Sequence, residues 1–179
     1  MVESTKPTVT ITGISGFLGS HVCLLYLQSG EYNVRGTVRS KTNEKRIEPL
    51  RKVFGDLFDQ LELVEADLLD EESLIAAIAG SDYVVHTASP FVTETVKDEN
   101  VLIKPAVNGT LAVMKGCRAA KVKRVVITSS VAAIMNVGDE SWPDDDIFTE
   151  ADWSEPESKM GSQAYNKSKT LAEKAAWDY

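Results

Sequence analysis

The chain is short of basic side chains and has no long apolar run. Its 179 residues include 19 lysines and arginines against 27 aspartates and glutamates, which gives a formal net charge of −8 and a pI near 4.8. A nucleic-acid-binding surface needs a basic footprint, so the acidic balance predicts no nucleic-acid partner and disfavours an anionic membrane surface. No segment reaches the roughly 18 consecutive apolar residues of a membrane-spanning helix. We therefore expect no membrane partner.

Cysteine is also scarce. Cys23 and Cys117 lie far apart, without the short spacing of metal ligands. We interpret them as buried or free thiols of a reducing compartment, not as a disulfide, and no metal site is predicted. Residues Met1–Pro7 are polar and lack the apolar run of a signal peptide, so the expected location is the cytoplasm.

What the chain does have is a regular alternation of β-rich and helix-like segments. Hydrophobic residues make up 43% of it, enough for a buried core. Its length lies in the range of about 100–200 residues that is typical of one domain. Strands are expected at Thr8–Thr12, Tyr32–Val38, Leu61–Ala66, Tyr83–Ala88 and Arg124–Ser129. Helices are expected at Gly16–Gln28, Thr42–Phe54, Glu71–Ala79 and Asp98–Ala120, with a last one within Gly161–Tyr179. This alternation predicts an α/β fold, a doubly wound parallel sheet with helices on both faces.

Local signals add detail to this outline. Asp70 is expected to cap the helix that follows it. Pro49 is expected to bend or split the second helix, and Pro105 to cause an irregularity in the fourth. The segment Ser141–Trp153 could border a substrate cleft, but its acidic run favours a solvated loop.

The first strand runs directly into a glycine-rich turn with G-x-x-G-x-x-G spacing. In such a turn one glycine reverses the chain, another lets the backbone approach a pyrophosphate, and the last allows close packing of helix on strand. The helix N-terminus then offers free N–H groups and a positive dipole end to the phosphates. Glycines also mark ordinary strand–helix turns, but the strand–turn–helix context favours dinucleotide binding and a Rossmann-type fold. The predicted phosphate-binding residues are Gly13, Ser15, Gly16, Phe17, Leu18 and Gly19.

The end of the second strand indicates which dinucleotide is bound. An NAD site usually has an acid there, about 20 residues on, to hold the ribose 2′-hydroxyl. This chain has Arg39 instead, followed by Lys45 and Arg46. A guanidinium can bind a 2′-phosphate with two charge-assisted hydrogen bonds, so the pattern predicts NADP(H) over NAD. The alternative is a solvated basic patch, an interpretation that suits Lys41 better than Arg39.

Further cofactor contacts are expected where the other strands end, because ligands bind at the carboxyl edge of such sheets. Asp67 is a candidate acceptor for the adenine amino group. His86 follows two valines and is interpreted as a packed strand histidine in preference to an acid–base group. The remaining predicted cofactor contacts are Leu68, Thr87, Ala88, Ser89 and Thr128.

Tyr165 and Lys169 are spaced i and i+4, which places both on one face of the last helix. A free tyrosine has a pKa near ~10 and transfers protons poorly at neutral pH. A neighbouring ammonium favours the phenolate and lowers that pKa, so Tyr165 is a candidate proton donor to a carbonyl oxygen whose carbon receives hydride. Lys169 can also bind the ribose next to the nicotinamide. A serine at the end of the fifth strand, in Thr128–Ser130, can donate a hydrogen bond to the same carbonyl oxygen.

Together these motifs resemble the extended short-chain dehydrogenase/reductases, in particular the group of dihydroflavonol reductases, cinnamoyl-CoA reductases and yeast-type methylglyoxal or aldehyde reductases. The matching stretches are Thr12–Gly19, Thr37–Arg39 with Lys45 and Arg46, Ala66–Leu68, His86–Pro90, Arg124–Ser130 and Tyr165–Tyr179. The resemblance implies an NADPH-dependent carbonyl reductase with a Ser–Tyr–Lys triad and a small-molecule carbonyl substrate. On the family motif the catalytic serine is Ser130, and Ser129 is its neighbour.

The resemblance also implies a C-terminal substrate lobe, whereas only ten residues follow Lys169. We therefore expect residues 1–179 to form an incomplete NAD(P)-binding domain. Two alternatives stay open. One is an NAD-linked sugar-nucleotide epimerase or dehydratase on the same fold, against which Arg39 argues. The other is a truncated, non-catalytic protein that binds a nucleotide or a partner, since fold alone does not imply function.

Overall fold

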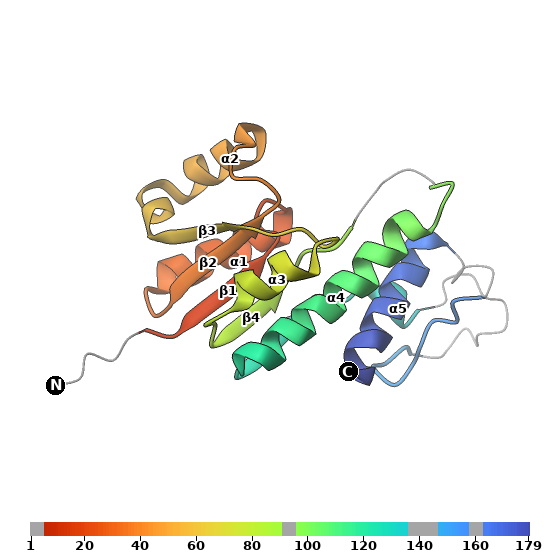
Figure 1. Cartoon of the computed structure of the whole chain (residues 1–179). Coiled ribbons are helices and arrows are strands. Elements are labelled where there is room, and N and C mark those ends of the chain that lie inside the picture. Colours follow the sequence, from red (N-terminus) through yellow and green to blue (C-terminus); the bar gives the residue numbers. More distant parts are fainter. Residues whose placement is uncertain (1–5, 91–95, 136–146, 158–162) are drawn as a thin grey trace. The chain divides into compact units, whose positions relative to one another are not determined.

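The computed structural model describes residues 6–90, 96–135, 147–157 and 163–179. The first five residues of the predicted polar N-terminus and the part of the predicted loop up to residue 146 lie outside the described residues. Within them, five parallel strands form one sheet in the order β3-β2-β1-β4-β5 (Figure 1). The strands are β1 (Thr8–Thr12), β2 (Asn33–Val38), β3 (Leu61–Glu65), β4 (Tyr83–His86) and β5 (Arg124–Ile127). This topology confirms the predicted Rossmann-type α/β fold.

The helices alternate with these strands along the chain. They are α1 (Phe17–Ser29), α2 (Glu44–Phe54), α3 (Glu71–Ile78), α4 (Asn100–Ala120) and α5 (Ala164–Asp178), with short 3-10 helices η1 (Gly55–Gln60) and η2 (Val131–Ala133). None of the helices in the described ranges is long and apolar enough to cross a membrane. The chain divides into two compact units, the first made of Met1–Ala88 and Ala112–Thr128, the second of Ser89–Leu111 and Ser129–Tyr179. All five strands belong to the first unit.

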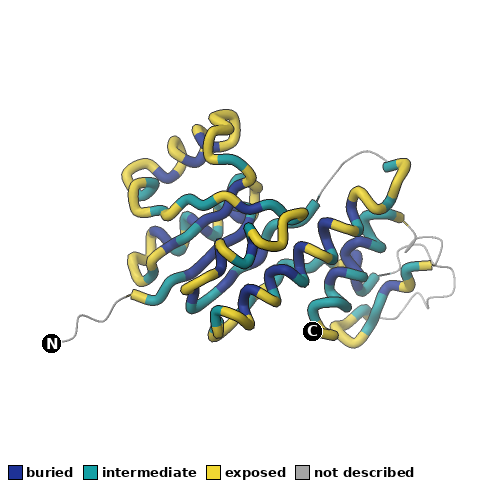
Figure 2. The backbone as a smooth tube through the Cα atoms, in the orientation of Figure 1, coloured by how far each residue is buried: buried dark blue, intermediate teal, exposed yellow. Residues whose placement is uncertain are grey.

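Helices cover both faces of the sheet in the first unit, and each face has its own buried core (Figure 2). The core under α1 and α2 consists of Val9, Ile11, Ile14, Cys23, Leu27, Val34, Val38, Ile47, Leu50 and Phe54. The core under α3 and the last turns of α4 consists of Ala66, Leu74, Ala77, Ile78, Val84, Ala112, Val113 and Cys117. Strand alternation separates the two sets. Val9 and Ile11 enter the first core, while the Thr10 hydroxyl lies 2.7 Å from that of Ser81 in the loop after α3.

Both cysteines are free and buried, as expected. Burial raises the pKa of the Cys23 thiol to about 12 and that of Cys117 to about 11, so each stays protonated at neutral pH. In the described part of the chain, no group of three or more His, Cys, Asp or Glu side chains is arranged to hold a metal ion.

The predicted helix cap is confirmed, and both prolines lie inside helices that are not split. Asp70 caps α3 as expected, since its Oδ1 accepts from Ser73 N at 3.1 Å. Pro49, however, does not split α2, and α4 runs without interruption through Pro105. A proline removes one helical hydrogen bond and costs about 3 kcal/mol, which packing of the surrounding turns offsets. In α2 that packing comes from three buried side chains, Ile47, Leu50 and Phe54.

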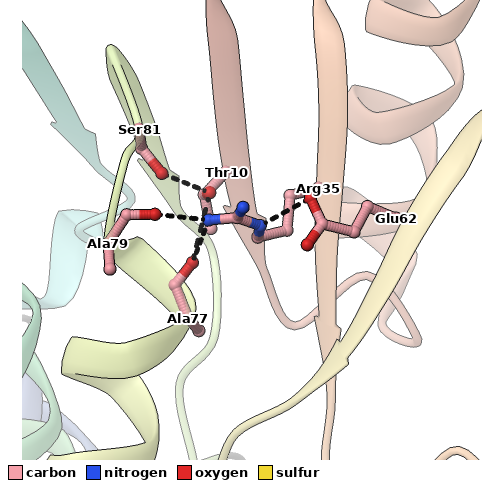
Figure 3. Close-up of polar contacts among 6 residues, drawn as sticks. All are labelled: Thr10, Arg35, Glu62, Ala77, Ala79 and Ser81. Atoms are coloured by element: carbon pink, nitrogen blue, oxygen red, sulfur yellow. Dashed lines mark hydrogen bonds and ion pairs between the residues drawn. The ribbon is translucent and has the colours of Figure 1, made fainter.

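An arginine on β2 ties the end of α3 to the sheet (Figure 3). Arg35 Nη1 donates to the carbonyls of Ala77 and Ala79 at 2.9 and 2.8 Å, and its Nε donates to Glu62 Oε2 at 2.8 Å. Ala77 and Ala79 lie at the C-terminus of α3, where carbonyls have no helical partner. The guanidinium therefore replaces the hydrogen bonds that a further turn of helix would have made.

Replacing Arg35 by alanine should destabilise the fold by about 2–3 kcal/mol, because two carbonyls lose a charged donor. Urea unfolding followed by circular dichroism measures this loss. Glu62→Gln is the matched control. The Glu62 side chain is 56% exposed, and exposed ion pairs contribute less than about 1 kcal/mol. Equal losses for the two variants would show that the ion pair, not the helix end, is what Arg35 stabilises.

Candidate functional site

The glycine-rich turn between β1 and α1 is fastened to β2 by three contacts. Gly13 N donates to Thr37 Oγ1 at 3.0 Å, and Ile14 N donates to Thr37 O at 3.1 Å. The Ile14 side chain is fully buried against Gly36, where an added Cβ would lie 2.5 Å from Ile14 Cδ1. Gly13 itself has φ +72°, a conformation that favours glycine. The conformation of the turn therefore depends on its contacts with β2 as much as on its own sequence.

The same turn also packs closely against the end of β4 and the start of α1. A Cβ at Gly13 would lie 2.9 Å from Ala88 Cα. A Cβ at Gly19 would lie 2.5 Å from Gly13 O and 2.7 Å from Thr87 Oγ1. A Cβ at Gly16, in contrast, would meet only Gly13 O, at 3.4 Å. Close packing thus requires glycine at positions 13 and 19, whereas a side chain at Gly16 would meet no close neighbour among the described residues.

The N-terminus of α1 suits an anionic ligand. Its N-cap, Gly16, makes no side-chain capping bond, and no acid lies in the first turn. Phe17 and Leu18 expose 84% and 45% of their surface, so their side chains do not cover the helix end, and Ser15 is half-buried. Uncapped N–H groups and the helix dipole together bind phosphate well. The residues present therefore fit the pyrophosphate of a dinucleotide.

Threonine hydroxyls hold the end of β4 to β1. Thr87 Oγ1 donates to Thr12 O at 2.6 Å, and Thr12 Oγ1 accepts from Ala88 N at 3.1 Å. Thr12 Oγ1 also lies 2.7 Å from Nδ1 of His86, which is buried, as expected for a packed strand histidine. The predicted contacts Thr87 and Ala88 thus have a structural role in closing the strand ends.

Four exposed cations follow the end of β2, namely Arg39, Lys41, Lys45 and Arg46. Arg39, Lys45 and Arg46 are exposed, and in the described ranges no ion pair or side-chain hydrogen bond engages any of them. Four cations elsewhere in the described ranges form ion pairs, namely Arg35, Lys115, Lys123 and Lys167. Unpaired cations at the carboxyl edge of the sheet are available to an anionic group such as a 2′-phosphate.

The remaining predicted cofactor residues lie at other strand ends. Asp67 follows β3, where its Oδ1 accepts from Leu69 N at 2.8 Å and orders the turn before α3, while Leu68 is half-buried. Thr128 follows β5 and donates from its N–H to a β4 carbonyl at 2.9 Å. Ser89 is half-buried and belongs to the second unit.

In the second unit, the two adjacent serines have different partners. Ser129 Oγ donates to Glu173 Oε2 on α5. Ser130 Oγ accepts from Ala132 N at 3.2 Å and thereby caps η2, which packs on α5. Among the described residues this is its only hydrogen bond, so the Ser130 hydroxyl proton is uncommitted. Within the described residues, the Ser129 hydroxyl is thus engaged with a carboxylate, whereas the Ser130 hydroxyl accepts from a backbone amide.

Tyr165 and Lys169 lie on α5, as the spacing predicted, one turn apart. Tyr165 is half-buried, and Lys169 exposes 8% of its surface. Desolvation lowers the pKa of the Lys169 ammonium, and the Glu173 carboxylate one turn further along α5 opposes that shift. The second unit therefore contains all three predicted catalytic residues, Ser130, Tyr165 and Lys169, together with a carboxylate that favours the charged lysine.

Three residues that support the site were not predicted as such. The Thr37 hydroxyl holds the glycine turn, the Thr12 hydroxyl holds the residues that follow β4, and Glu173 joins α5 to Ser129. The threonines had a visible signal, because each stands at or near the carboxyl end of a strand. Glu173 had a weaker one, its i+4 spacing from Lys169.

Comparison with known proteins extends this description. The model of the "NAD dependent epimerase/dehydratase family" matches residues 9–179. The chain is 44% identical to a dihydroflavonol 4-reductase of Arabidopsis thaliana, covering 98% of this chain and 46% of the relative. It is 40% identical to a bifunctional dihydroflavonol 4-reductase/flavanone 4-reductase of Malus domestica, covering 98% of this chain and 50% of the relative. The chain thus spans about half the length of the curated relatives it matches.

The fold is also similar to that of a solved reductase. The yeast methylglyoxal/isovaleraldehyde reductase complexed with NADPH superposes with a TM-score of 0.79 at 30% identity. The superposition covers 96% of this chain and 52% of the yeast protein. This chain therefore shares the fold of a relative that was solved in complex with NADPH.

Gly19→Ala should destabilise the fold by about 3 kcal/mol or more, because the new methyl group would overlap backbone that cannot move away. Gly16→Ala should cost about 1 kcal/mol or less, since it changes only an N-cap glycine. Thermal and urea unfolding of the two variants provides the comparison. If Gly19→Ala proved as stable as Gly16→Ala, the close packing of α1 on the turn would be disproved.

Proposed function

The chain belongs to the NAD dependent epimerase/dehydratase family, and from this premise we propose that it serves an NADPH-dependent reduction of a ketone or aldehyde to an alcohol. The observation that carries the proposal is the packing of η2 on α5, two elements of one unit. Ser130 caps η2, and Tyr165 and Lys169 lie on α5. The reductase relatives support the same assignment by their names, and each is about twice as long as this chain.

The choice of NADPH as the proposed cofactor rests on the positive charges that follow β2. Arg39 stands where an NAD site has an acid, and it is exposed and unpaired within the described residues. Lys45 and Arg46 on α2 add two further unpaired cations. The residues proposed to hold the pyrophosphate are Gly13–Gly19 with the first amides of α1. NADPH, when bound, supplies the hydride that reduces the carbonyl carbon.

The chain's own residues would handle the proton. In the proposed reaction Tyr165 Oη gives its proton to the carbonyl oxygen, which becomes the alcohol hydroxyl, and the tyrosine is left as phenolate. The Lys169 ammonium stabilises that phenolate by charge. Ser130 Oγ donates a hydrogen bond to the same oxygen and so orients the carbonyl before proton transfer. Solvent then returns a proton to Tyr165.

Arg39→Gln should weaken NADPH binding by roughly tenfold or more while changing NADH binding little, because a charge-assisted bond contributes about 1.5–3 kcal/mol. Fluorescence titration of both cofactors measures this selectivity. Lys41→Gln is the matched control, since it removes the same charge two residues away and should leave the NADPH preference intact. Equal NADPH and NADH affinities in the wild-type chain would refute the NADP assignment.

Tyr165→Phe should reduce carbonyl-dependent NADPH oxidation by at least about a hundredfold, the usual contribution of general acid catalysis. Tyr179→Phe, at an exposed tyrosine just past α5, should leave the rate unchanged. Ser130→Ala should be slower than wild type. If no simple ketone or aldehyde stimulates NADPH oxidation by the wild-type chain, carbonyl reduction by this chain is refuted.

A further inference from the structure

The turn between β2 and α2 connects Arg39 to Lys45 and Arg46, the other cations of the predicted phosphate site. Most of its hydrogen bonds are internal. Ser40 Oγ lies 3.0 Å from Thr42 Oγ1 and accepts from Thr42 N at 3.3 Å. Two more lead into α2, where Glu44 N donates to Thr42 O at 3.0 Å and Asn43 N donates to Ser40 O at 3.5 Å. Among the described residues, one hydrogen bond joins residues 40–42 to a strand, and it runs from Lys41 N to Glu65 Oε1 at 2.7 Å. The Glu65 carboxylate is therefore the link between this turn and the neighbouring strand β3.

Glu65 is well placed for this contact by the sheet. It is the last residue of β3, and its register partner is Val38, the last residue of β2. Arg39 follows Val38 directly, so the carboxylate lies at the strand end from which the cations begin. No ion pair joins Glu65 to Arg39, Lys45 or Arg46 within the described ranges. The carboxylate thus accepts from a backbone amide and leaves the cations available.

We propose that Glu65 is a positioning residue for cofactor selection. Its carboxylate fixes the turn at Lys41 and thereby holds Arg39 and the start of α2 in the arrangement that binds the 2′-phosphate. This inference rests on the proposed preference for NADPH and goes beyond it, because it assigns the preference in part to an acid on a different strand. A carboxylate near a phosphate also repels it, so the negative charge of Glu65 by itself would weaken NADPH binding. The two effects predict different results for two substitutions at the same position.

Glu65→Gln keeps an oxygen acceptor for Lys41 N but removes the charge, and Glu65→Ala removes both. If Glu65 acts by position, Glu65→Gln keeps the wild-type ratio of NADPH to NADH affinity within about twofold, and Glu65→Ala lowers that ratio by roughly five- to tenfold. If Glu65 acts by charge, both variants bind NADPH more tightly than wild type. Glu48→Ala is the charge control, because it removes one exposed acid from α2 without touching the turn.

The experiment combines cofactor titration with amide hydrogen exchange on the cofactor-free chain. Exchange at Lys41 should be slow in wild type and in Glu65→Gln, and faster in Glu65→Ala. Unchanged Lys41 exchange in Glu65→Ala would overturn the inference, as would an unchanged NADPH to NADH ratio in that variant. A wild-type chain that binds both cofactors equally would refute the NADP assignment and this inference together. A preference that is present in wild type and fully retained in Glu65→Ala would refute the inference alone.

Discussion

The structure of the first unit depends on how closely the β1–α1 turn approaches its neighbours. Gly13 packs on the backbone of Ala88, Gly19 packs on Gly13 itself, and Ile14 fills the space above Gly36. Because these contacts are backbone to backbone or side chain to glycine, they permit almost no adjustment. They fix β1 between β2 and β4, and they direct the N-terminus of α1 toward the carboxyl edge of the sheet. This one geometry therefore links the packing of the three central strands to the position of the α1 N-terminus.

Most of the fold could be predicted because its signals are local. Short β-rich runs separated by capped helices indicate the element order, and parallel pairing follows from it. The strand ends were less accurate, since β4 was predicted to extend to Ala88 and ends at His86. Thr87 resembles a strand residue by type, but its hydroxyl bonds to the Thr12 carbonyl, and Ala88 N bonds to a side chain instead of the ladder. Tertiary hydrogen bonds of this kind leave no periodic pattern in the sequence.

The candidate site could be predicted to the same extent and for the same reason. Glycine spacing, a cation at a strand end and a Tyr–Lys pair one helical turn apart are local patterns, and each is found on the element expected for it. The contacts that support these residues are long-range. Glu65 acts on the amide of Lys41 and Glu173 on the hydroxyl of Ser129. An acid that accepts from a backbone amide gives no sequence signal, because any residue except proline can be its partner.

The excess of acidic residues is compatible with an anionic cofactor because, in the described ranges, no ion pair neutralises Arg39, Lys45 or Arg46. The ammonium groups of Lys115, Lys123 and Lys167 are each in ion pairs, and the Arg35 guanidinium is held by Glu62 and two carbonyls. Exposed charges are screened beyond about 8–10 Å at moderate salt, so distant acids scarcely affect the potential at the end of β2. What an approaching phosphate meets there is set by nearby groups, and one acid at this edge, Glu65, accepts a hydrogen bond from the backbone amide of Lys41. The net charge of −8 therefore governs solubility more than it governs ligand choice.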